Sequence, residues 1–338
     1  MMSGEARHQR HQPVEEGWTG PFHFLALADP QLGTLHSNEA WDEELEMLRK
    51  AIAHANRLKP AFVVFLGDLV HAFPDQSEEL KQIQTQQVED FRTALAEMDS
   101  NIPIYYVSGN HDLGNKLTHN ALQLYRQRFG PDFFEFTCRG VRGVVLNTQA
   151  FDDPDATELA EEQIRFLQSA LEIEDDNGDD DGDDDDDSAQ DQEGRRGDAS
   201  KKSRGAERDT RPRIVQKIVF GHIPPFLFEE DEPDGYFNIA PEMRARLLGI
   251  AKKAGVRLWM SGHYHRNAVG RAGELEAVTT SAVGTTLHPS GIDPLGLKGF
   301  DDFQCGEQHS GFRVVRVYED RIEHDWYTMA NVPQSIAL

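Results

Sequence analysis

Hydrophobic residues along the chain fall into two alternating patterns. Short uninterrupted apolar runs are typical of buried strands, whereas apolar residues three or four positions apart are typical of helices that pack one face against a sheet. Residues 22–28 and 61–66 show the first pattern, and residues 39–58 between them show the second. Ser37 or Asn38 stands where the cap of that helix is expected. The same alternation continues along most of the chain.

This alternation predicts an α/β fold. The expected further strands are residues 104–107, 133–136, 141–146, 214–220 and 256–260. The expected further helices are residues 78–98, 118–129, 157–171 and 241–254. The tail at residues 275–329 is mostly β in pattern, most plainly at 312–318 and 322–327. Strands that alternate with helices and are followed by a β-rich segment indicate a layered fold with the helices outside.

One segment interrupts the pattern. Between Ile173 and Ile214 there is no large aliphatic or aromatic residue. Residues 172–193 contain 14 acidic and no basic residues, and residues 194–213 contain 8 basic and 3 acidic residues. Such a segment cannot bury enough apolar surface to offset the entropy lost on ordering it, so a disordered insert is predicted at residues 174–211.

The predicted organisation is one domain at residues 21–330 that this insert interrupts, with a disordered N-terminal tail at 1–20 and a C-terminal tail at 331–338. The longest apolar runs are about six residues, far short of the roughly 20 that a transmembrane helix needs, and no secretory signal is readable. Two cysteines exclude a disulfide framework, so a reducing cytoplasm is the expected compartment. The net charge of −25 disfavours nucleic acid and anionic membrane as partners.

Polar residues follow five of the expected strands, at the point where each strand ends. Their sequences are Asp29-Pro30-Gln31, Gly67-Asp68-Leu69-Val70-His71, Gly109-Asn110-His111-Asp112, Gly221-His222 and Gly262-His263-Tyr264-His265. Each of them alone is typical of a turn or a helix cap. Ligands of open α/β sheets bind beyond the carboxyl ends of the strands, and glycine lets the backbone bend sharply beside a ligand. Five such strand ends in one chain therefore indicate one shared site.

The side chains at these strand ends are those of a metal centre. The seven candidate ligands are Asp29, Gln31, Asp68, Asn110, His222, His263 and His265. Seven ligands exceed the needs of one tetrahedral zinc ion. They suit two ions about 3.5–4 Å apart that share one carboxylate, an arrangement that clamps the attacking and leaving oxygens in phosphoryl transfer. Carboxylate, amide and imidazole donors without a thiolate favour Mn, Mg, Fe or Zn.

In this order the motifs resemble those of the calcineurin-like metallophosphoesterases, over residues 21–327 apart from the insert. The resemblance implies a β-sandwich flanked by helices, in four layers α/β/β/α. The ligand roles that it implies are a bridging position for Asp68, a first ion completed by Asp29, Gln31 and His265, and a second ion completed by Asn110, His222 and His263. It also implies a metal-bound hydroxide as nucleophile and no covalent intermediate.

The resemblance assigns catalytic roles to two further residues. His111 would protonate the leaving alkoxide, a role that needs a group that changes charge near neutral pH. Asp112 would orient His111 or hold its loop. His71 is as consistent with a structural role as with a substrate contact or support of the ligands. Arg266 is as consistent with an ion pair as with a contact to a phosphate oxygen.

Gln31 departs from the family pattern, because most members of the family have histidine at this position. An amide oxygen is a weaker and harder ligand than imidazole. The first ion is therefore expected to bind more loosely, or to be Mn or Mg rather than Zn. The alternative is that Gln31 acts through a water molecule.

The expected function is hydrolysis of a phosphate ester, and the resemblance points to a protein serine/threonine phosphatase that acts on phosphorylated proteins. One alternative is a phosphodiesterase that acts on nucleotides or other small phosphate esters. Another is a non-catalytic metal-binding scaffold whose acidic insert binds basic partners, although the complete ligand set argues against it. The sequence predicts no oligomeric state.

Overall fold

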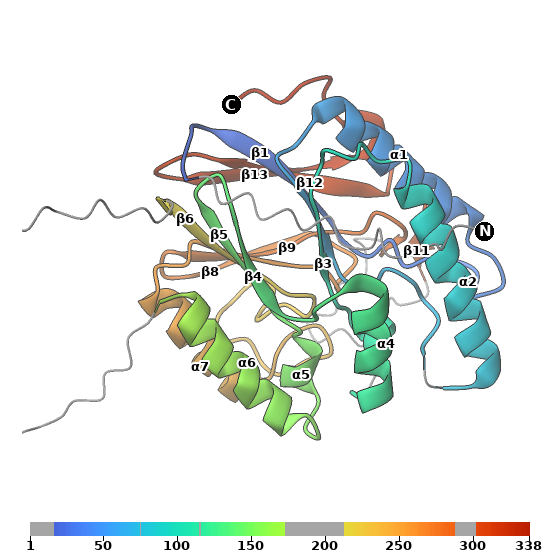
Figure 1. The fold of residues 1–338 in the computed structure, drawn as a ribbon, viewed down its shortest axis with the longest axis horizontal. Helices are drawn as coiled ribbons and strands as arrows, with labels where there is room; N and C mark the ends of the chain where they lie inside the picture. Colours follow the sequence, from blue (N-terminus) through green and yellow to red (C-terminus); the bar gives the residue numbers. More distant parts are fainter. Residues whose placement is uncertain (1–16, 75, 115, 173–212, 288–301) are drawn as a thin grey trace, which may run out of the picture.

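A computed structural model of the chain describes residues 17–74, 76–114, 116–172, 213–287 and 302–338 (Figure 1). The expected insert at 174–211 and most of the expected N-terminal tail lie outside these residues. No helix in the described part of the chain is long and apolar enough to cross a membrane.

Two large sheets form the centre of the fold. The first has the order β13-β12-β1-β2-β3, and the second has the order β4-β5-β6-β7-β9-β8. The strands of the first are β1 (Phe22–Leu27), β2 (Val63–Leu66), β3 (Ile104–Val107), β12 (Gly311–Val317) and β13 (Ile322–Thr328). Those of the second are β4 (Phe134–Cys138), β5 (Val141–Val145), β6 (Gln216–Phe220), β7 (Leu258–Ser261), β8 (Ala268–Ala272) and β9 (Leu275–Thr279). A small ladder pairs β10 (Thr286–Leu287) with β11 (Phe303–Gln304).

Parallel pairing brings the carboxyl ends of the central strands to a common edge. β1, β2 and β3 are parallel to one another, with Leu25 opposite Val63 and Val63 opposite Ile104. In the second sheet β5, β6, β7 and β9 are parallel, while β4 and β8 close its two sides as antiparallel partners. The loops that follow these strands are therefore neighbours in space.

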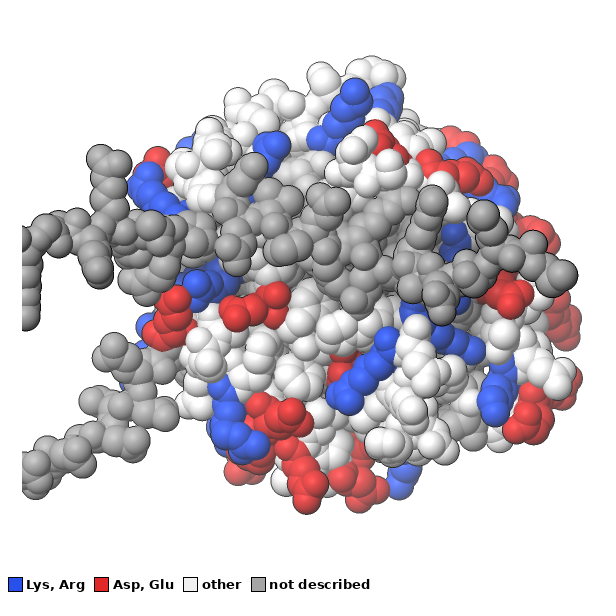
Figure 2. Space-filling view, in the orientation of Figure 1, with Lys and Arg blue, Asp and Glu red and all other residues white. Residues whose placement is uncertain are grey.

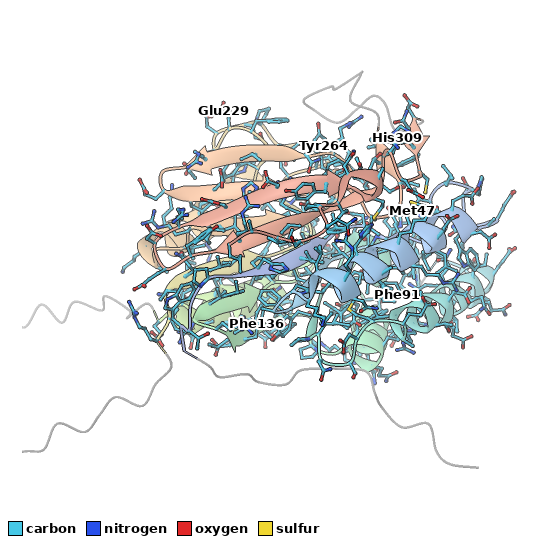
Figure 3. The ribbon with its side chains drawn as sticks, turned by 90° about the horizontal axis from the view of Figure 1, so that it is seen from above. Met47, Phe91, Phe136, Glu229, Tyr264 and His309 are labelled. Carbon is cyan, nitrogen blue, oxygen red and sulfur yellow. The ribbon has the colours of Figure 1, made fainter. Side chains whose placement is uncertain are left out.

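Helices cover the outer face of each sheet (Figure 1). The helices are α1 (Asp42–Leu58), α2 (Glu78–Leu95), α3 (Asn110–Leu113), α4 (His119–Phe129), α5 (Gln149–Asp152), α6 (Thr157–Ala170) and α7 (Pro241–Lys253), with a 3₁₀ turn at Met329–Asn331. α1, α2 and α4 pack on the first sheet, and Figure 3 shows Met47 of α1 and Phe91 of α2 on that side. α6 and α7 pack on the second sheet.

Side chains alternate between the two faces of each strand, so every central strand is buried on both sides. Phe24 of β1 faces the second sheet and stacks on Phe62 with ring centroids 4.4 Å apart, whereas Leu25 belongs to the core under α1 and α2. Tyr105 of β3 stacks on Phe136 of β4 at 3.8 Å across the two sheets. The expected order of helix, sheet, sheet and helix is confirmed.

The start of the first helix was predicted wrongly. α1 begins at Asp42 with Trp41 as its cap residue, and neither Ser37 nor Asn38 caps it. Both residues lie in the preceding loop with φ values of 50° and 70°. The Asn38 side chain instead accepts a hydrogen bond from Gln87 Nε2 of α2 at 2.9 Å. A long-range contact thus uses the side chain that local capping would have used.

Candidate metal centre

Three of the strand-end loops are joined to one another by hydrogen bonds. The Asp29 N–H donates to Gly67 O (3.2 Å), and the Gln31 N–H donates to Asp68 O (2.9 Å). The His263 N–H donates to the Asp29 carboxylate at 3.1 Å. The loops after β1, β2 and β7 therefore form one connected floor, as their positions in the sequence predicted.

The side chains above this floor converge. His222 Nε2 lies 3.2 Å from Asp68 Oδ2 and 3.1 Å from Asn110 Oδ1. His265 Nε2 lies 3.6 Å from Asp29 Oδ1, and His222 Nδ1 lies 4.0 Å from that same oxygen. Asp68, His222 and His263, all buried, each offer one ligand atom within 4.8 Å of the others. Six of the seven expected ligands thus form one continuous cluster of side chains.

Gln31, the seventh, is held beside Asp68 by its backbone and is 3% exposed. Its Oε1 atom is buried and accepts no hydrogen bond from the described residues. Leaving a buried carbonyl oxygen without a partner costs about 1–3 kcal/mol. An oxygen in that state fits a site that is completed by a cation or by water bound to one, so the residues present fit a metal centre.

Backbone strain is concentrated in the same loops. Ten non-glycine residues of the described chain have positive φ, and five of them are expected ligands. Their φ values are 48° at Asp29, 36° at Gln31, 49° at Asp68, 69° at His263 and 54° at His265. Each such residue costs roughly 1 kcal/mol or more and persists only where its surroundings impose it. The strain supports a functional role for these loops, because strain of this kind gathers at sites organised in advance.

Two glycines allow the carboxylates to approach the backbone. A Cβ atom on Gly109 would lie 2.1 Å from Asp68 Oδ1, and one on Gly262 would lie 2.5 Å from Asp29 Oδ2. Both distances are shorter than any real contact. Glycine before Asn110 and before His263 is thus a steric requirement of the site.

Backbone carbonyls orient the three histidines. His222 Nδ1 lies 2.7 Å from Leu66 O, and His265 Nδ1 lies 2.6 Å from Thr285 O. His263 Nε2 lies 3.0 Å from Tyr236 O. A carbonyl only accepts hydrogen bonds, so each of these nitrogens carries the hydrogen. The other nitrogen of each ring, Nε2 of His222 and His265 and Nδ1 of His263, is left for the centre.

The charges of the cluster favour a cation. Burial raises the pKa of Asp29 well above its usual range, and the nearby Asp68 carboxylate adds to that effect. Burial lowers the pKa of His263 to about 3 and that of His265 to about 4, so both rings are neutral at neutral pH, as ligation requires. Burial alone would lower the pKa of His222 as well, but Asp68 and Asp29 raise it to about 9, so His222 would release its Nε2 proton on binding an ion.

This geometry agrees with the comparison to known proteins. The family model described as calcineurin-like phosphoesterase matches residues 22–267. The chain belongs to the calcineurin-like phosphoesterase family. Serine/threonine-protein phosphatase CPPED1 of Danio rerio is 34% identical over 93% of this chain and 87% of its own length, and that of Homo sapiens is 33% identical over 93% and 86%. A solved dimetal phosphatase from Danio rerio, 13% identical, shares the fold with a TM-score of 0.53 over 92% of this chain and 97% of its own.

His111 lies at the edge of the phosphoesterase centre. Its N–H donates to Asp68 Oδ1 at 2.8 Å, and its ring Nδ1 lies 2.6 Å from His71 O. The ring is stacked between those of His71 (4.6 Å) and Phe73 (4.3 Å). The carbonyl fixes the hydrogen on Nδ1, which leaves Nε2 for a proton-transfer partner.

Asp112 bonds to the loops of the phosphoesterase centre and is 6% exposed. Its Oδ1 accepts from the Leu69 N–H at 3.0 Å, and its Oδ2 accepts from the Gly109 N–H at 2.9 Å. Burial and the Asp68 carboxylate raise the pKa of Asp112 to about 7. Of the two roles open to Asp112, these bonds correspond to holding the loop.

His71 and Arg266, the remaining two expected residues, lie in different surroundings. His71 is next to the His111 ring, and its Nδ1 lies 3.2 Å from Thr34 Oγ1. Burial lowers the pKa of His71 to about 3. The Arg266 guanidinium is buried and lies 5.3 Å from the centre of the Tyr264 ring, which packs on Phe237.

Arg313 of β12 is a supporting residue that the sequence did not reveal. It is 4% exposed, and its guanidinium donates to Thr280 Oγ1 and to Asn267 Oδ1, both at 2.6 Å. Asn267 Oδ1 also accepts from the Ser281 N–H, and the Ser281 hydroxyl donates to His265 O at 2.9 Å. Arg313 therefore fastens the segment that carries His265.

Replacing Arg313 by methionine is expected to lower the affinity of the centre for Mn²⁺ roughly 10- to 100-fold, because Asn267 and Ser281 lose the group that orders them. Isothermal titration of the metal-stripped protein measures this affinity. Arg316→Met is the matched control, since Arg316 lies on the same strand and pairs with Glu323 and Asp325. Equal affinities in the two variants would contradict the prediction.

Proposed function

We propose that this phosphoesterase hydrolyses phosphate monoesters, with phosphoserine and phosphothreonine in proteins as its substrates. The observation that carries the proposal is the buried cluster of carboxylate, amide and imidazole donors around Asp68 and His222. The protein substrate rests on the relatives that are named serine/threonine-protein phosphatases and on the share of both chains that they match.

The proposal places two divalent ions in this cluster. Asp68 lies at its middle and would be a ligand of both ions. Asp29, Gln31 and His265 are assigned to one ion, and Asn110, His222 and His263 to the other. The 3.6 Å contact of His265 with Asp29 and the 3.1 Å contact of His222 with Asn110 support this division. The oxygen donor Gln31 supports Mn or Mg over Zn at the first position.

Ions held there would supply an acidified water and would neutralise charge on the phosphoryl oxygens. The protein supplies the rest of the chemistry. The Nδ1 hydrogen bond of His111 to His71 O fixes its tautomer, so a protonated His111 can give its Nε2 proton to the oxygen that leaves phosphorus. Asp112 keeps the two loops that flank His111 at a constant separation through its bonds to Leu69 and Gly109.

The cysteines bear on where the protein acts, and the surface charge bears on its substrate. Cys138 and Cys305 are free, which supports a reducing compartment such as the cytoplasm. Acidic and basic side chains are interspersed on the face drawn in Figure 2. A mixed surface of this kind on a chain of net charge −25 supports protein rather than nucleic-acid substrates.

The test of the substrate class compares three esters under one condition. Metal-stripped protein with added Mn²⁺ is assayed on a phosphoserine peptide, on bis-p-nitrophenyl phosphate and on a cyclic nucleotide. Turnover of the phosphopeptide that disappears on chelation is expected. Activity confined to the two diesters would show a phosphodiesterase on the same centre and contradict the proposal.

Gln31→His is expected to tighten binding of Zn²⁺ roughly 10-fold, because imidazole is the softer ligand and replaces an amide oxygen. Affinities for Zn²⁺ and Mn²⁺ are measured by competition with a chelating dye. Gln84→His is the control, since Gln84 is also buried but lies on α2, where its Oε1 accepts from Arg128. An unchanged affinity would mean that Gln31 does not contact the ion directly.

A further inference from the structure

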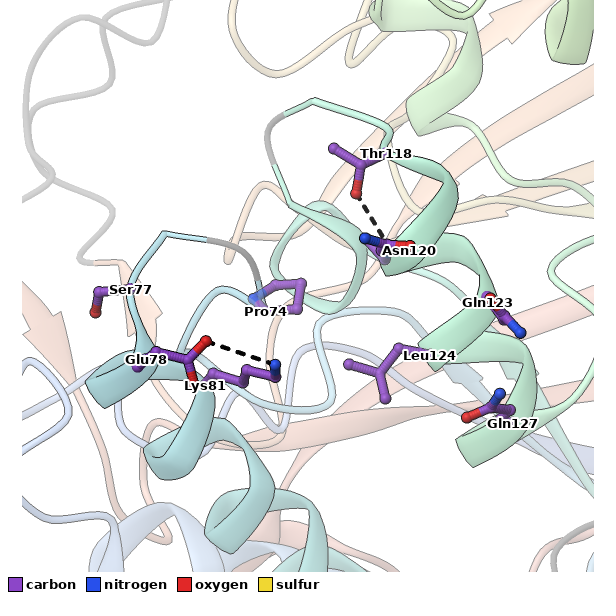
Figure 4. A pocket seen from close by; sticks show the side chains of 10 residues that line it. Pro74, Ser77, Glu78, Lys81, Thr118, Asn120, Gln123, Leu124 and Gln127 are labelled. Carbon is purple, nitrogen blue, oxygen red and sulfur yellow. Dashed lines mark hydrogen bonds and ion pairs between the residues drawn. The ribbon is translucent and has the colours of Figure 1, made fainter.

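An open groove lies between α2 and α4, at the side of the molecule that carries His111. Its volume is about 550 Å³, which is within the range of ligand sites. Polar residues outnumber apolar ones in its lining, among them Ser77, Lys81, Asn120, Gln123 and Gln127, and Pro74 lies between the residues of α2 and those of α4 (Figure 4). We call this feature the α2–α4 groove.

One residue that lines the groove is adjacent in the chain to a residue that contacts the His111 ring. Phe73 stacks on that ring at 4.3 Å, and the next residue, Pro74, lines the groove. On the other wall, α4 follows the short helix α3, which contains His111, and the two helices are in contact. Each wall therefore follows, within a few residues along the chain, a segment that contains or contacts His111.

This position matches one part of the substrate in the proposed reaction. In that reaction the phosphoryl group would lie over the ligand side chains around Asp68, and His111 would give its Nε2 proton to the leaving oxygen. That oxygen belongs to the serine or threonine side chain, so the rest of the substrate must lie on the His111 side of the phosphate. The α2–α4 groove is on that side.

The lining suits the backbone of a peptide. Side-chain amides and hydroxyls both donate and accept hydrogen bonds, as an extended peptide backbone requires. Glu78 and Lys81 at the groove lie 3.7 Å apart and are exposed, so their charges offset one another and do not select a polyanion. Helix α4 rises about 10 Å between Asn120 and Gln127, which corresponds to about three residues of extended peptide.

We propose that the α2–α4 groove binds the peptide segment next to the phosphorylated residue of a protein substrate, in extended conformation. The proposal rests on the proposed phosphatase function and adds to it the surface that selects a peptide over a small ester. About three residues on one side of the phosphoserine or phosphothreonine occupy the groove.

The test fills the groove and measures two substrates. Gln123 is an exposed residue in the middle of the α4 wall, so Gln123→Trp obstructs the groove without entering the core. The ratio of kcat/KM on a phosphoserine peptide to kcat/KM on p-nitrophenyl phosphate is expected to fall about 10-fold, since only the peptide uses the groove. Gln82→Trp is the matched control, because Gln82 is exposed on α2 but does not line the groove, and its ratio is expected to equal that of the wild type.

A second measurement uses the unaltered protein. Extending the phosphopeptide by about three residues on one side is expected to raise kcat/KM, and Gln123→Trp is expected to remove this gain. An unchanged ratio in Gln123→Trp, or no effect of peptide length, would overturn the groove proposal while leaving the phosphatase proposal intact. Turnover of p-nitrophenyl phosphate without turnover of any phosphopeptide would overturn the protein-substrate proposal and, with it, the groove.

Discussion

Asp68→Asn is expected to lower metal-dependent phosphatase turnover at least roughly 10³-fold, which corresponds to a loss of about 4 kcal/mol in transition-state stabilisation. Asp68 lies at the middle of the cluster, with its Oδ2 3.2 Å from His222 and its Oδ1 accepting from the His111 N–H. An amide keeps the shape of this group but removes the charge that bound cations would share. Initial rates on a phosphopeptide at saturating Mn²⁺ measure the loss.

The same variant has a readout that does not depend on activity. Mn²⁺ is expected to raise the unfolding temperature of the wild type, since it binds only the folded chain, and to raise that of Asp68→Asn much less. Without metal the variant is expected to unfold at a lower temperature, because, despite burial, His222 and its neighbouring histidines hold the pKa of Asp68 well below its usual range and the variant removes the charge that pairs with His222 at 3.2 Å. Asp155→Asn, at an exposed surface pair with Lys116, is the control. Full metal stabilisation in Asp68→Asn would contradict the assignment of Asp68.

His111→Asn is expected to lower kcat on a phosphoserine peptide by about 10²–10⁴, the usual contribution of a general acid. The serine alkoxide is a poor leaving group and needs the proton, whereas p-nitrophenolate leaves as a stable anion. The loss on p-nitrophenyl phosphate is therefore expected to be much smaller. Steady-state kinetics on both substrates at one pH and one metal concentration measure the two losses.

The contrast between the two substrates is what tests the proton transfer. Equal losses on both would show that His111 acts on the position of the loop and not on the leaving group. His119→Asn is the matched control, because His119 is an exposed histidine in the first turn of α4. It is expected to change neither rate.

Most of the candidate centre could be predicted from the sequence. Parallel strands end at one edge of a sheet, so Asp29, Asp68 and Asn110 had to be neighbours once their strands were recognised. The glycines at 109 and 262 were expected to let the backbone approach a ligand closely, and the structure places a carboxylate of the site against each of them. The layered fold followed from the same alternation of strand and helix. The proposed division of ligands between two ions came from the family resemblance and is still to be tested.

The orientation of the ligands could not be predicted. The tautomers of His222, His263 and His265 depend on the carbonyls of Leu66, Tyr236 and Thr285. Every residue type has a backbone carbonyl, so nothing in the sequence distinguishes these three acceptors. Only the packing of segments far apart in the chain selects them.

The same limit applies to the support of the site and to its surroundings. Arg313 stands in a strand pattern like its neighbour Arg316, yet one is buried against Asn267 and the other pairs at the surface. Asn38 lost its expected capping role to a contact with α2. The α2–α4 groove exists only because two helices lie side by side. The sequence by itself thus determined the donor set and the layered sheets, because both follow from local pattern and strand order. The tertiary structure decided the hydrogen positions, the buried supports and the groove between α2 and α4, because these depend on pairings between distant segments that have no local signature.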